Sequence, residues 1–166
     1  MSAFVSVVLG SKSDWTLMQE CAKTLERLGV AYEAIVASAH RTPDRVAQYV
    51  KEAEEGGALA FIAAAGMAAH LAGAIAARTT KPVIAVPIAS GALNGIDALL
   101  SCVQMPSKIP AACVAINGAI NAAYLAAQIL ALNDPKLARK LLEDRQNIGA
   151  QAELDSRSIE VRLARR

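Results

Sequence analysis

The stretch AFVSVVLGSKSD, residues 3–14, decides the fold that we expect for this chain. Its first half, Ala3–Leu9, is a short apolar run rich in β-branched residues, which is typical of a buried strand. Gly10–Asp14 then supplies the small and polar residues of a tight turn. Beyond the turn, apolar residues recur at helical spacing at Met18, Cys21, Ala22, Leu25 and Leu28. The segment therefore predicts a strand, a tight turn and a helix.

The same order of strand and helix repeats along the rest of the chain. Further strands are expected at Ala31–Ala37, Leu59–Ala64, Pro82–Val86 and Ala111–Ile116. Helices are expected at Asp44–Glu55, Ala68–Arg78, about Leu93–Gln104, about Ala119–Leu132 and Lys136 to about Gly149. Parallel strands need crossover helices, and strands that are apolar on both sides need cover on both faces. The alternation predicts an α/β fold, a three-layer α/β/α sandwich around a five-stranded parallel sheet.

Length and composition restrict the class of protein. With 166 residues, the chain is expected to form a single domain, residues 1–166. Hydrophobic residues make up 54% of the chain and aromatic residues only 4%, so we expect apolar surface to be buried between subunits as well as within one. The net charge is +2 and no basic run alternates with aromatic residues, which excludes nucleic acid as a partner. A small anionic ligand is compatible with this balance.

The cysteines and the apolar segments indicate the compartment. Cys21, Cys102 and Cys113 are widely spaced and lie within apolar patterns, so we interpret them as buried free thiols in reducing surroundings. There is no charged start followed by a long apolar core, and no uninterrupted apolar span of about 20 residues, so we expect a cytoplasmic protein with no membrane partner. Two well-separated histidines without paired cysteines or carboxylates predict no metal site.

Residues 38–44, SAHRTPD, follow the second expected strand and hold the main candidate for chemistry. His40 can accept and release a proton at cellular pH, since the ordinary pKa of histidine is near ~6.5, and Arg41 offers a planar fork for phosphate or carboxylate. A purely structural interpretation is also open, in which Thr42 caps the next helix and Pro43 takes its first position.

Other loops are expected at the same edge, because ligands of such sheets bind beyond the carboxyl ends of the strands. Gly10–Asp14 places two hydroxyls and backbone amides at a helix start, which favours a phosphate completed by Arg41; the alternative is a structural cap by Ser13 or Asp14. The small residues of Ala64–His70 suit a flat heteroaromatic ring, and His70 either joins the site or packs on the following helix. Ser90–Asn94 and Ser101–Pro106 are candidate walls of a pocket for a phosphorylated small molecule.

Four blocks taken together resemble the PurE family of purine biosynthesis: GSKSDW at 10–15, SAHRTPD at 38–44, AAHL at 68–71 and SCVQMP at 101–106. The match runs in order from about residue 4 to 132. It implies a flavodoxin-like fold, usually a homo-octamer, and an enzyme that makes 4-carboxy-5-aminoimidazole ribonucleotide from a small ribonucleotide without metal or cofactor. AAHL with QMP resembles the mutase branch, an isomerase that moves a carboxyl group from the exocyclic nitrogen to ring carbon 4. The alternatives are a carboxylase that uses carbon dioxide directly and, more remotely, a non-catalytic ribonucleotide- or flavin-binding protein.

The resemblance also implies roles for particular residues. His40 is the catalytic proton carrier, and Ser38 and Ala39 face the base and the carboxyl group beside it. The other substrate-binding residues that the resemblance implies are Ser11 and Asp14 at the ribonucleotide, Ser13 and Arg41 at its phosphate, and Gly66, Ala68, His70 and Leu71. The chain departs from the family pattern at Ala64 and Met67, which replace glycines, and at Ala72, which replaces a proline.

Two segments predict contacts between subunits. The expected helix at 119–132 is apolar on nearly every side, so we expect it to be enclosed all round, with a neighbouring subunit as part of its cover. From about residue 134 we expect a helix and tail that pack on a neighbouring subunit. The charged remainder to Arg166 is expected to be partly disordered or to lie on that neighbour.

Overall fold

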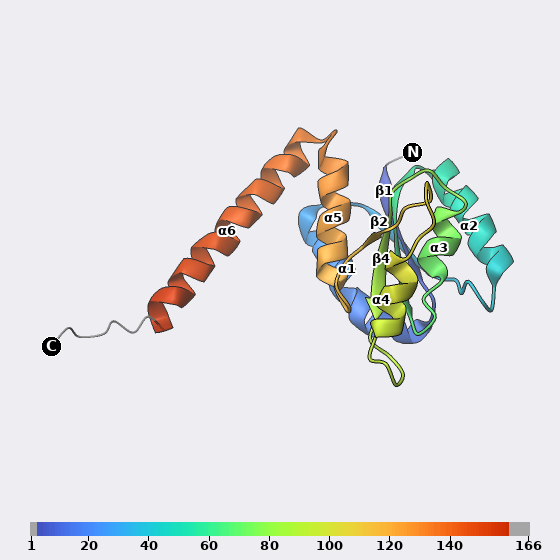
Figure 1. Cartoon of the computed structure of the whole chain (residues 1–166). Helices are drawn as coiled ribbons and strands as arrows, with labels where there is room; N and C mark the ends of the chain where they lie inside the picture. The colour runs from blue at the N-terminus through green and yellow to red at the C-terminus, as the bar shows by residue number, and fades with distance from the viewer. Residues whose placement is uncertain (1–2, 160–166) are drawn as a thin grey trace.

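The computed structural model describes residues 3–159, which form a five-stranded parallel sheet with helices on both faces (Figure 1). The strands are β1 (Phe4–Leu9), β2 (Tyr32–Val36), β3 (Ala58–Gly66), β4 (Val83–Ile88) and β5 (Ala112–Cys113). The helices are a short 3-10 turn η1 (Lys12–Asp14), α1 (Trp15–Leu28), α2 (Pro43–Gly56), α3 (Leu71–Ala76), α4 (Ile96–Val103), α5 (Ala119–Ala131) and α6 (Pro135–Ile159). The strand order is β2-β1-β3-β4-β5, which is the flavodoxin-like order, and the predicted sandwich is confirmed.

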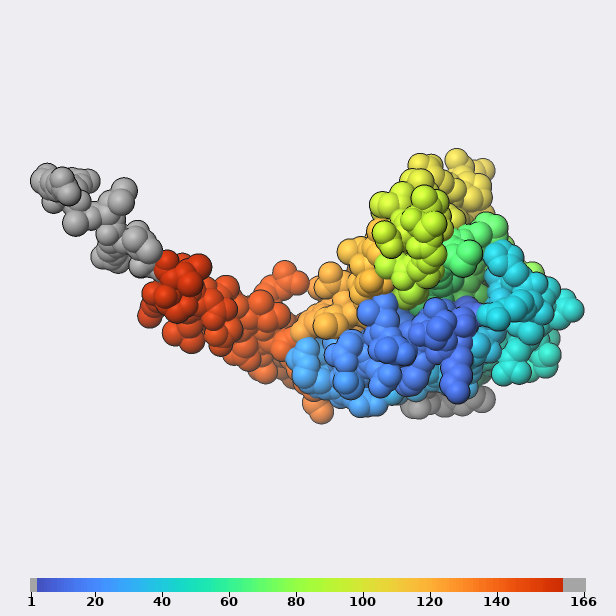
Figure 2. All heavy atoms as spheres, turned by 90° about the horizontal axis from the view of Figure 1, so that it is seen from below, coloured from blue at the N-terminus to red at the C-terminus, as the bar shows by residue number. Residues whose placement is uncertain are grey.

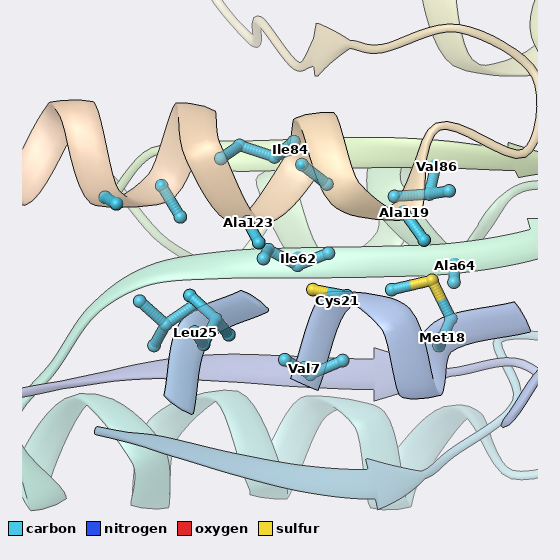
Figure 3. Close-up of a cluster of buried hydrophobic side chains, with 14 of the residues drawn as sticks. Val7, Met18, Cys21, Leu25, Ile62, Ala64, Ile84, Val86, Ala119 and Ala123 are labelled. Carbon is cyan, nitrogen blue, oxygen red and sulfur yellow. The ribbon is translucent and has the colours of Figure 1, made fainter. Parts of the chain in front are cut away.

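Helices α1 and α5 cover one face of the sheet. Figure 3 shows Met18, Cys21 and Leu25 of α1 gathered with Ala123 of α5 around Ile62 of β3, and all five side chains are fully buried. Alanines at the inner positions of α5 let its backbone approach the sheet closely, because small side chains leave no gap in a close-packed core. The apolar spacing predicted for α1 is confirmed.

Helices α2, α3 and α4 cover the opposite face and support the loops of the site. The inner positions predicted for α2, which are Val46, Tyr49, Val50 and Ala53, are all buried. The Tyr49 hydroxyl forms a 2.8 Å hydrogen bond with the hydroxyl of Ser6, a fully buried residue of β1. This polar pair fixes α2, which begins just after the His40 loop, against the strand that leads into the serine loop.

Several predicted boundaries were wrong. Helix α3 begins at Leu71 rather than Ala68, because Met67 adopts a left-handed φ of 55° and the His70 amide donates to the Ala68 carbonyl at 2.8 Å, which closes a turn. Strand β5 has two residues rather than six, and it lies at the edge of the sheet, where one neighbour alone defines its length. The predicted burial of all three cysteines is correct for Cys21 and Cys102, whereas Cys113 of β5 is only partly buried.

Helix α6 is much longer than predicted. It continues past Gly149 to Ile159, since one interior glycine costs a helix only about 1 kcal/mol and helix formers follow it, with Gln151 donating to Asp155 at 2.8 Å. Figures 1 and 2 show α6 leaving the body of the protein, with nothing beside its C-terminal half. The charged segment after Ile159 lies outside the described residues.

The expected enclosure of α5 on every side is not reached within one chain. Its alanine face is buried, but Ile120 is exposed, because no element of the described residues covers that face. Three side chains join the outer side of α5 to α1 and α6: Arg27 donates to Asp144 at 2.7 Å and to the Tyr124 hydroxyl at 2.6 Å, and Tyr124 donates to Asp144. These bonds join the N-terminal half of α6 to α1 and α5.

Candidate active site

A cavity of about 500 Å³ lies at the carboxyl edge of the sheet, where β1, β2 and β3 end. The catalytic and substrate-binding residues that the family resemblance implied all border it: Ser11, Ser13, Asp14, Ser38, Ala39, His40, Arg41, Gly66, Ala68, His70 and Leu71. The cavity is also lined by Gly10, Ala65, Met67 and Ser90, which the sequence analysis named as members of the candidate loops but to which it gave no individual role. The prediction that the loops after these strands meet at one site is therefore correct in its geometry, and the role of each residue stays a prediction.

The serine loop after β1 is held by its own side chains. The Ser11 amide donates to Asp14 Oδ2 at 2.9 Å, and the Ser13 amide and hydroxyl both reach Ser11 Oγ, at 3.3 and 2.9 Å. This is a capping box, in which Ser11 rather than Ser13 accepts from the helix amides. The prediction that Ser13 or Asp14 accepts from the helix amides is therefore wrong in its residues, since Ser11 caps the short turn and Asp14 precedes α1 without a side-chain cap bond. The loop is a structural cap and also borders the cavity.

Asp14 lies at the base of this loop and is only 8% exposed. Burial raises the pKa of its carboxyl group, and the hydrogen bonds from Ser11 and Ser13 and the charge of Arg41 oppose that rise. A carboxylate with these partners is an acceptor suited to ligand hydroxyls, whereas it would repel a phosphate at contact distance.

Arg41 bridges two of the loops. Its Nη2 donates to the Gly10 carbonyl at 2.8 Å, and its Nε lies 3.4 Å from Ser38 Oγ. Because a guanidinium has five N–H groups in a fixed fork, these two bonds orient the fork and leave other donors for an anion. The carbonyl of Gly10 was missed at the level of sequence, because backbone acceptors carry no sequence signal.

The predicted cap by the Thr42 side chain is wrong. Thr42 does occupy the position before α2, and Pro43 starts the helix, but the Thr42 hydroxyl accepts from the Ser38 amide at 3.0 Å and donates to the Ser38 carbonyl at 3.2 Å. The backbone amide of Thr42 also donates to the Ser38 carbonyl, at 2.9 Å. The segment from Ser38 to Thr42 is thus a closed turn with His40 near its apex.

The two histidines of the chain contact each other directly. His40 Nε2 lies 2.7 Å from His70 Nδ1, and the rings meet edge to face with their centroids 4.8 Å apart. One ring comes from the loop after β2 and the other from the residue before α3. The sequence placed both residues at one edge of the sheet, but the hydrogen bond between them is a result of the structure.

The floor of the cavity requires small residues. A Cβ atom at Gly66 would lie 2.2 Å from Ser90 Oγ and 3.1 Å from the Ile88 carbonyl, and a Cβ at Gly10 would lie 3.3 Å from Ala65 Cβ. Met67 occupies a left-handed position where the family resemblance expects glycine, and the residue is 59% exposed at the rim. Most of this side chain therefore projects into solvent.

Other candidate walls do not border the cavity. In the segment 90–94, Ser90 alone borders it. Residues 101–106 lie elsewhere, with the Ser101 hydroxyl bonded to the Asp97 carbonyl at 2.8 Å and Met105 packed against the core. Asn117 does not border the cavity, but its Oδ1 accepts a hydrogen bond from the Ala89 amide at 2.9 Å. This bond holds the backbone next to Ser90.

The described residues also bear on metal binding, membrane spanning and thiol chemistry. Residues 3–159 contain no group of three or more histidine, cysteine or acidic side chains placed to hold a metal ion. None of the helices in that range is both long and apolar enough to span a bilayer. Burial raises the pKa of the Cys21 and Cys102 thiols to about 12, so neither is a ready nucleophile.

The fold and the cavity define a flavodoxin-like α/β/α protein with a small-molecule site that can bind an anion and carry a proton. A family model described as AIR carboxylase matches residues 4–151. The chain belongs to the AIR carboxylase family.

Individual relatives agree with this assignment. The N5-carboxyaminoimidazole ribonucleotide mutase of Pyrococcus horikoshii is 50% identical over 156 residues, which is 94% of this chain and 88% of the relative. The protein of the same name from Bacillus subtilis is 52% identical over 149 residues, 89% of this chain and 92% of the relative. A crystal structure of Treponema denticola PurE superposes with a TM-score of 0.87 at 28% identity, covering 96% of this chain and all of that one. The resemblance to the PurE family is confirmed.

Proposed function

We propose that this protein is an isomerase of purine biosynthesis that converts N5-carboxyaminoimidazole ribonucleotide to 4-carboxy-5-aminoimidazole ribonucleotide. The observation that carries the proposal is the identity of about half of all residues, over most of the chain, with relatives that bear the mutase name. The cavity supports it, because His40, Arg41 and the serine loop surround one space of suitable chemistry.

The phosphate of the substrate is assigned to Arg41 and the serine loop. Arg41 is exposed, oriented by Gly10 and Ser38, and retains free N–H groups. Ser13 is exposed beside it and offers a hydroxyl. Ser11 and Asp14 are assigned to the ribose, since the Asp14 carboxylate accepts hydrogen bonds from hydroxyls.

The base and the migrating carboxyl group are assigned to the space between the two histidine loops. Ser38, Ala39 and His40 form one wall of it. Gly66, Ala68, His70 and Leu71 form the other. The walls are built from small side chains around the two imidazole rings, which leaves room for a flat ring and for a molecule of carbon dioxide.

The reaction is assigned two balanced halves. In the first, the bond between the carboxyl carbon and the exocyclic nitrogen breaks, carbon dioxide leaves, and the nitrogen takes a proton from protonated His40. In the second, carbon 4 attacks the trapped carbon dioxide, and the hydrogen on carbon 4 returns to His40 as a proton, which restores the aromatic ring. Loss of hydration promotes the first half, and confinement of the gas beside carbon 4 promotes the second.

We also propose that the chain works as a homo-octamer in which α6 and the segment from about residue 134 pack on a neighbouring subunit. Three features support this assembly. The cavity is open in one chain, where His40 and Arg41 are exposed. Helix α4 carries an exposed apolar stripe, and α6 also exposes several large apolar residues. They are Ile96, Leu100 and Val103 on α4, and Leu142, Ile148 and Leu154 on α6. Light scattering after gel filtration measures the subunit number, and a monomer would contradict this part of the proposal.

The activity is tested with the purified protein and two substrates. The carbamate substrate alone should be converted at low carbon dioxide, whereas the unsubstituted ribonucleotide with bicarbonate should react far more slowly. The opposite preference would contradict the mutase assignment in favour of direct carboxylation. His40→Asn should lose turnover while calorimetry still detects ribonucleotide binding; substantial turnover in this variant would remove His40 from its role. A cytoplasmic location stays a prediction, and it rests on the three free thiols.

A further inference from the structure

The contact between the two imidazole rings restricts how each can hold a proton. At 2.7 Å, His40 Nε2 and His70 Nδ1 are within hydrogen-bond distance, so one nitrogen carries the hydrogen and the other accepts it. Among the described residues, His40 Nδ1 and His70 Nε2 have no hydrogen-bond partner in the protein. The pair therefore has one internal bond and two outer nitrogens that are free for other chemistry.

The direction of the bond follows from the chemistry proposed for His40. To give a proton to the substrate, His40 must first be protonated on both nitrogens, and in that state Nε2 can only donate. His70 must then accept through Nδ1, which places its own hydrogen on Nε2. When His40 has delivered a proton from Nδ1, the bond to His70 is unchanged and no ring has to turn. Delivery from Nε2 instead would require the 2.7 Å contact to break in every cycle.

We infer that His70 is a positioning residue whose Nδ1 accepts from His40 Nε2–H, which fixes the tautomer of His40 and leaves His40 Nδ1 as the nitrogen that exchanges protons with the substrate. The second half of this inference rests on the proposed function, and the first half does not. The arrangement follows the same logic as a hydrogen-bonded partner that orients a catalytic imidazole in other enzymes. It also gives His70 a role beyond lining the cavity.

The tautomers are measured first, without any substrate. The chain contains two histidines, so a long-range ¹H–¹⁵N correlation spectrum shows only four ring nitrogens in an untagged protein. At about pH 8, both rings should show the Nε2–H form. His70→Asn identifies the signals of His40 by removing the others. A spectrum with His40 in the Nδ1–H form would overturn the inference whether or not the protein is a mutase.

Three substitutions at His70 then separate positioning from substrate binding. His70→Asn can present its amide oxygen where Nδ1 lies, His70→Gln reaches toward the position of Nε2 instead, and His70→Leu offers no acceptor. Partners that orient a metal-bound imidazole contribute roughly 10–100-fold. By analogy, kcat should fall by about that factor in the Leu and Gln variants and stay within about fivefold in the Asn variant. KM should change less than about threefold in all of them, because the inference gives the His70 nitrogens a bond to His40 and none to the substrate.

Two kinetic results would overturn the inference. One is an Asn variant as slow as the Leu variant, which would show that the acceptor at this position is irrelevant. The other is a change confined to KM, which would make His70 a substrate contact. His70 is exposed, so these variants should fold, and unchanged melting temperatures check that they do. A wild-type protein without mutase activity would defeat the proposed function alone, because the spectrum still decides the tautomer.

Discussion

Arg41 provides the sharpest test of how the site holds an anion. Its guanidinium is held by Gly10 at 2.8 Å and lies 3.4 Å from Ser38 Oγ, so it is oriented before any ligand arrives. A hydrogen bond to a charged group contributes about 1.5–3 kcal/mol. Since each 1.4 kcal/mol is a factor of ten, Arg41→Met should raise KM for the ribonucleotide roughly 10–150-fold. The value of kcat should change little, because the phosphate is remote from the carbons that react.

The assay compares the ribonucleotide with the matching nucleoside, which lacks the phosphate. Arg41→Met should weaken binding of the ribonucleotide and leave binding of the nucleoside unchanged, as measured by calorimetry. Arg41→Lys should fall between wild type and Arg41→Met, because it keeps the charge but loses the fork. Arg45→Met is the matched control, since Arg45 is an exposed arginine of α2 that does not border the cavity.

An equal loss for both ligands would refute this assignment. That result would mean that Arg41 acts by joining the Gly10 and Ser38 loops rather than by binding phosphate. A KM within about threefold of wild type would refute it as well, since the lost bond would then be far below the range for charged groups.

Three further predictions concern stability. Tyr49→Phe leaves the buried Ser6 hydroxyl without a partner and should lower the free energy of unfolding by about 1–3 kcal/mol, whereas adding Ser6→Ala should recover most of the loss in urea denaturation. Gly66→Ala places a Cβ 2.2 Å from Ser90 Oγ and should cost about 1–3 kcal/mol, and Ser90→Ala in the same chain should return part of it; an unchanged melting temperature would show that the floor is not tight. Hydrogen bonds from a tyrosine and an arginine lower the pKa of Asp144, so its contribution to stability is present above the unfolded value near 3.8 and is lost as pH falls through the lower folded value. Asp144→Asn should therefore destabilise the protein at neutral pH, and the difference from wild type should shrink toward about pH 3 in denaturation curves.

Local patterns predicted the elements well wherever one face of the element is buried. The spacing of Met18, Cys21 and Leu25 predicted α1 correctly, because a helix that covers a sheet must repeat its apolar residues every three or four positions. The same reasoning did not predict where α6 ends. This helix leaves the body of the protein, so its C-terminal half has no buried face and therefore no apolar pattern that marks its last turn. The prediction of a Thr42 cap also failed. The Thr42 hydroxyl could bond either to the first amides of α2 or to the backbone of Ser38, and it bonds to Ser38.

The loops that border the cavity could be nominated from sequence because they follow the strands directly, and the edge at which parallel strands end is fixed by their direction. The roles of individual residues came from the family resemblance. Ser90 was only one member of a candidate wall, and the Gly10 carbonyl was missed entirely. A serine or a glycine at these positions looks the same in sequence as it would in an ordinary loop. The two residues belong to the site because the fold brings other loops close to them.

The sequence by itself determined the alternation of strand and helix, the three-layer class and the loops that carry the chemistry, because periodicity and turn residues act over a few neighbouring positions. Only the tertiary structure decided the strand order and the contacts that join separate loops, such as Arg41 to Gly10 and His40 to His70. These pairs lie about thirty residues apart in the chain, and they meet because β1 lies between β2 and β3 in the sheet. That placement depends on packing of the whole domain, which no local pattern encodes.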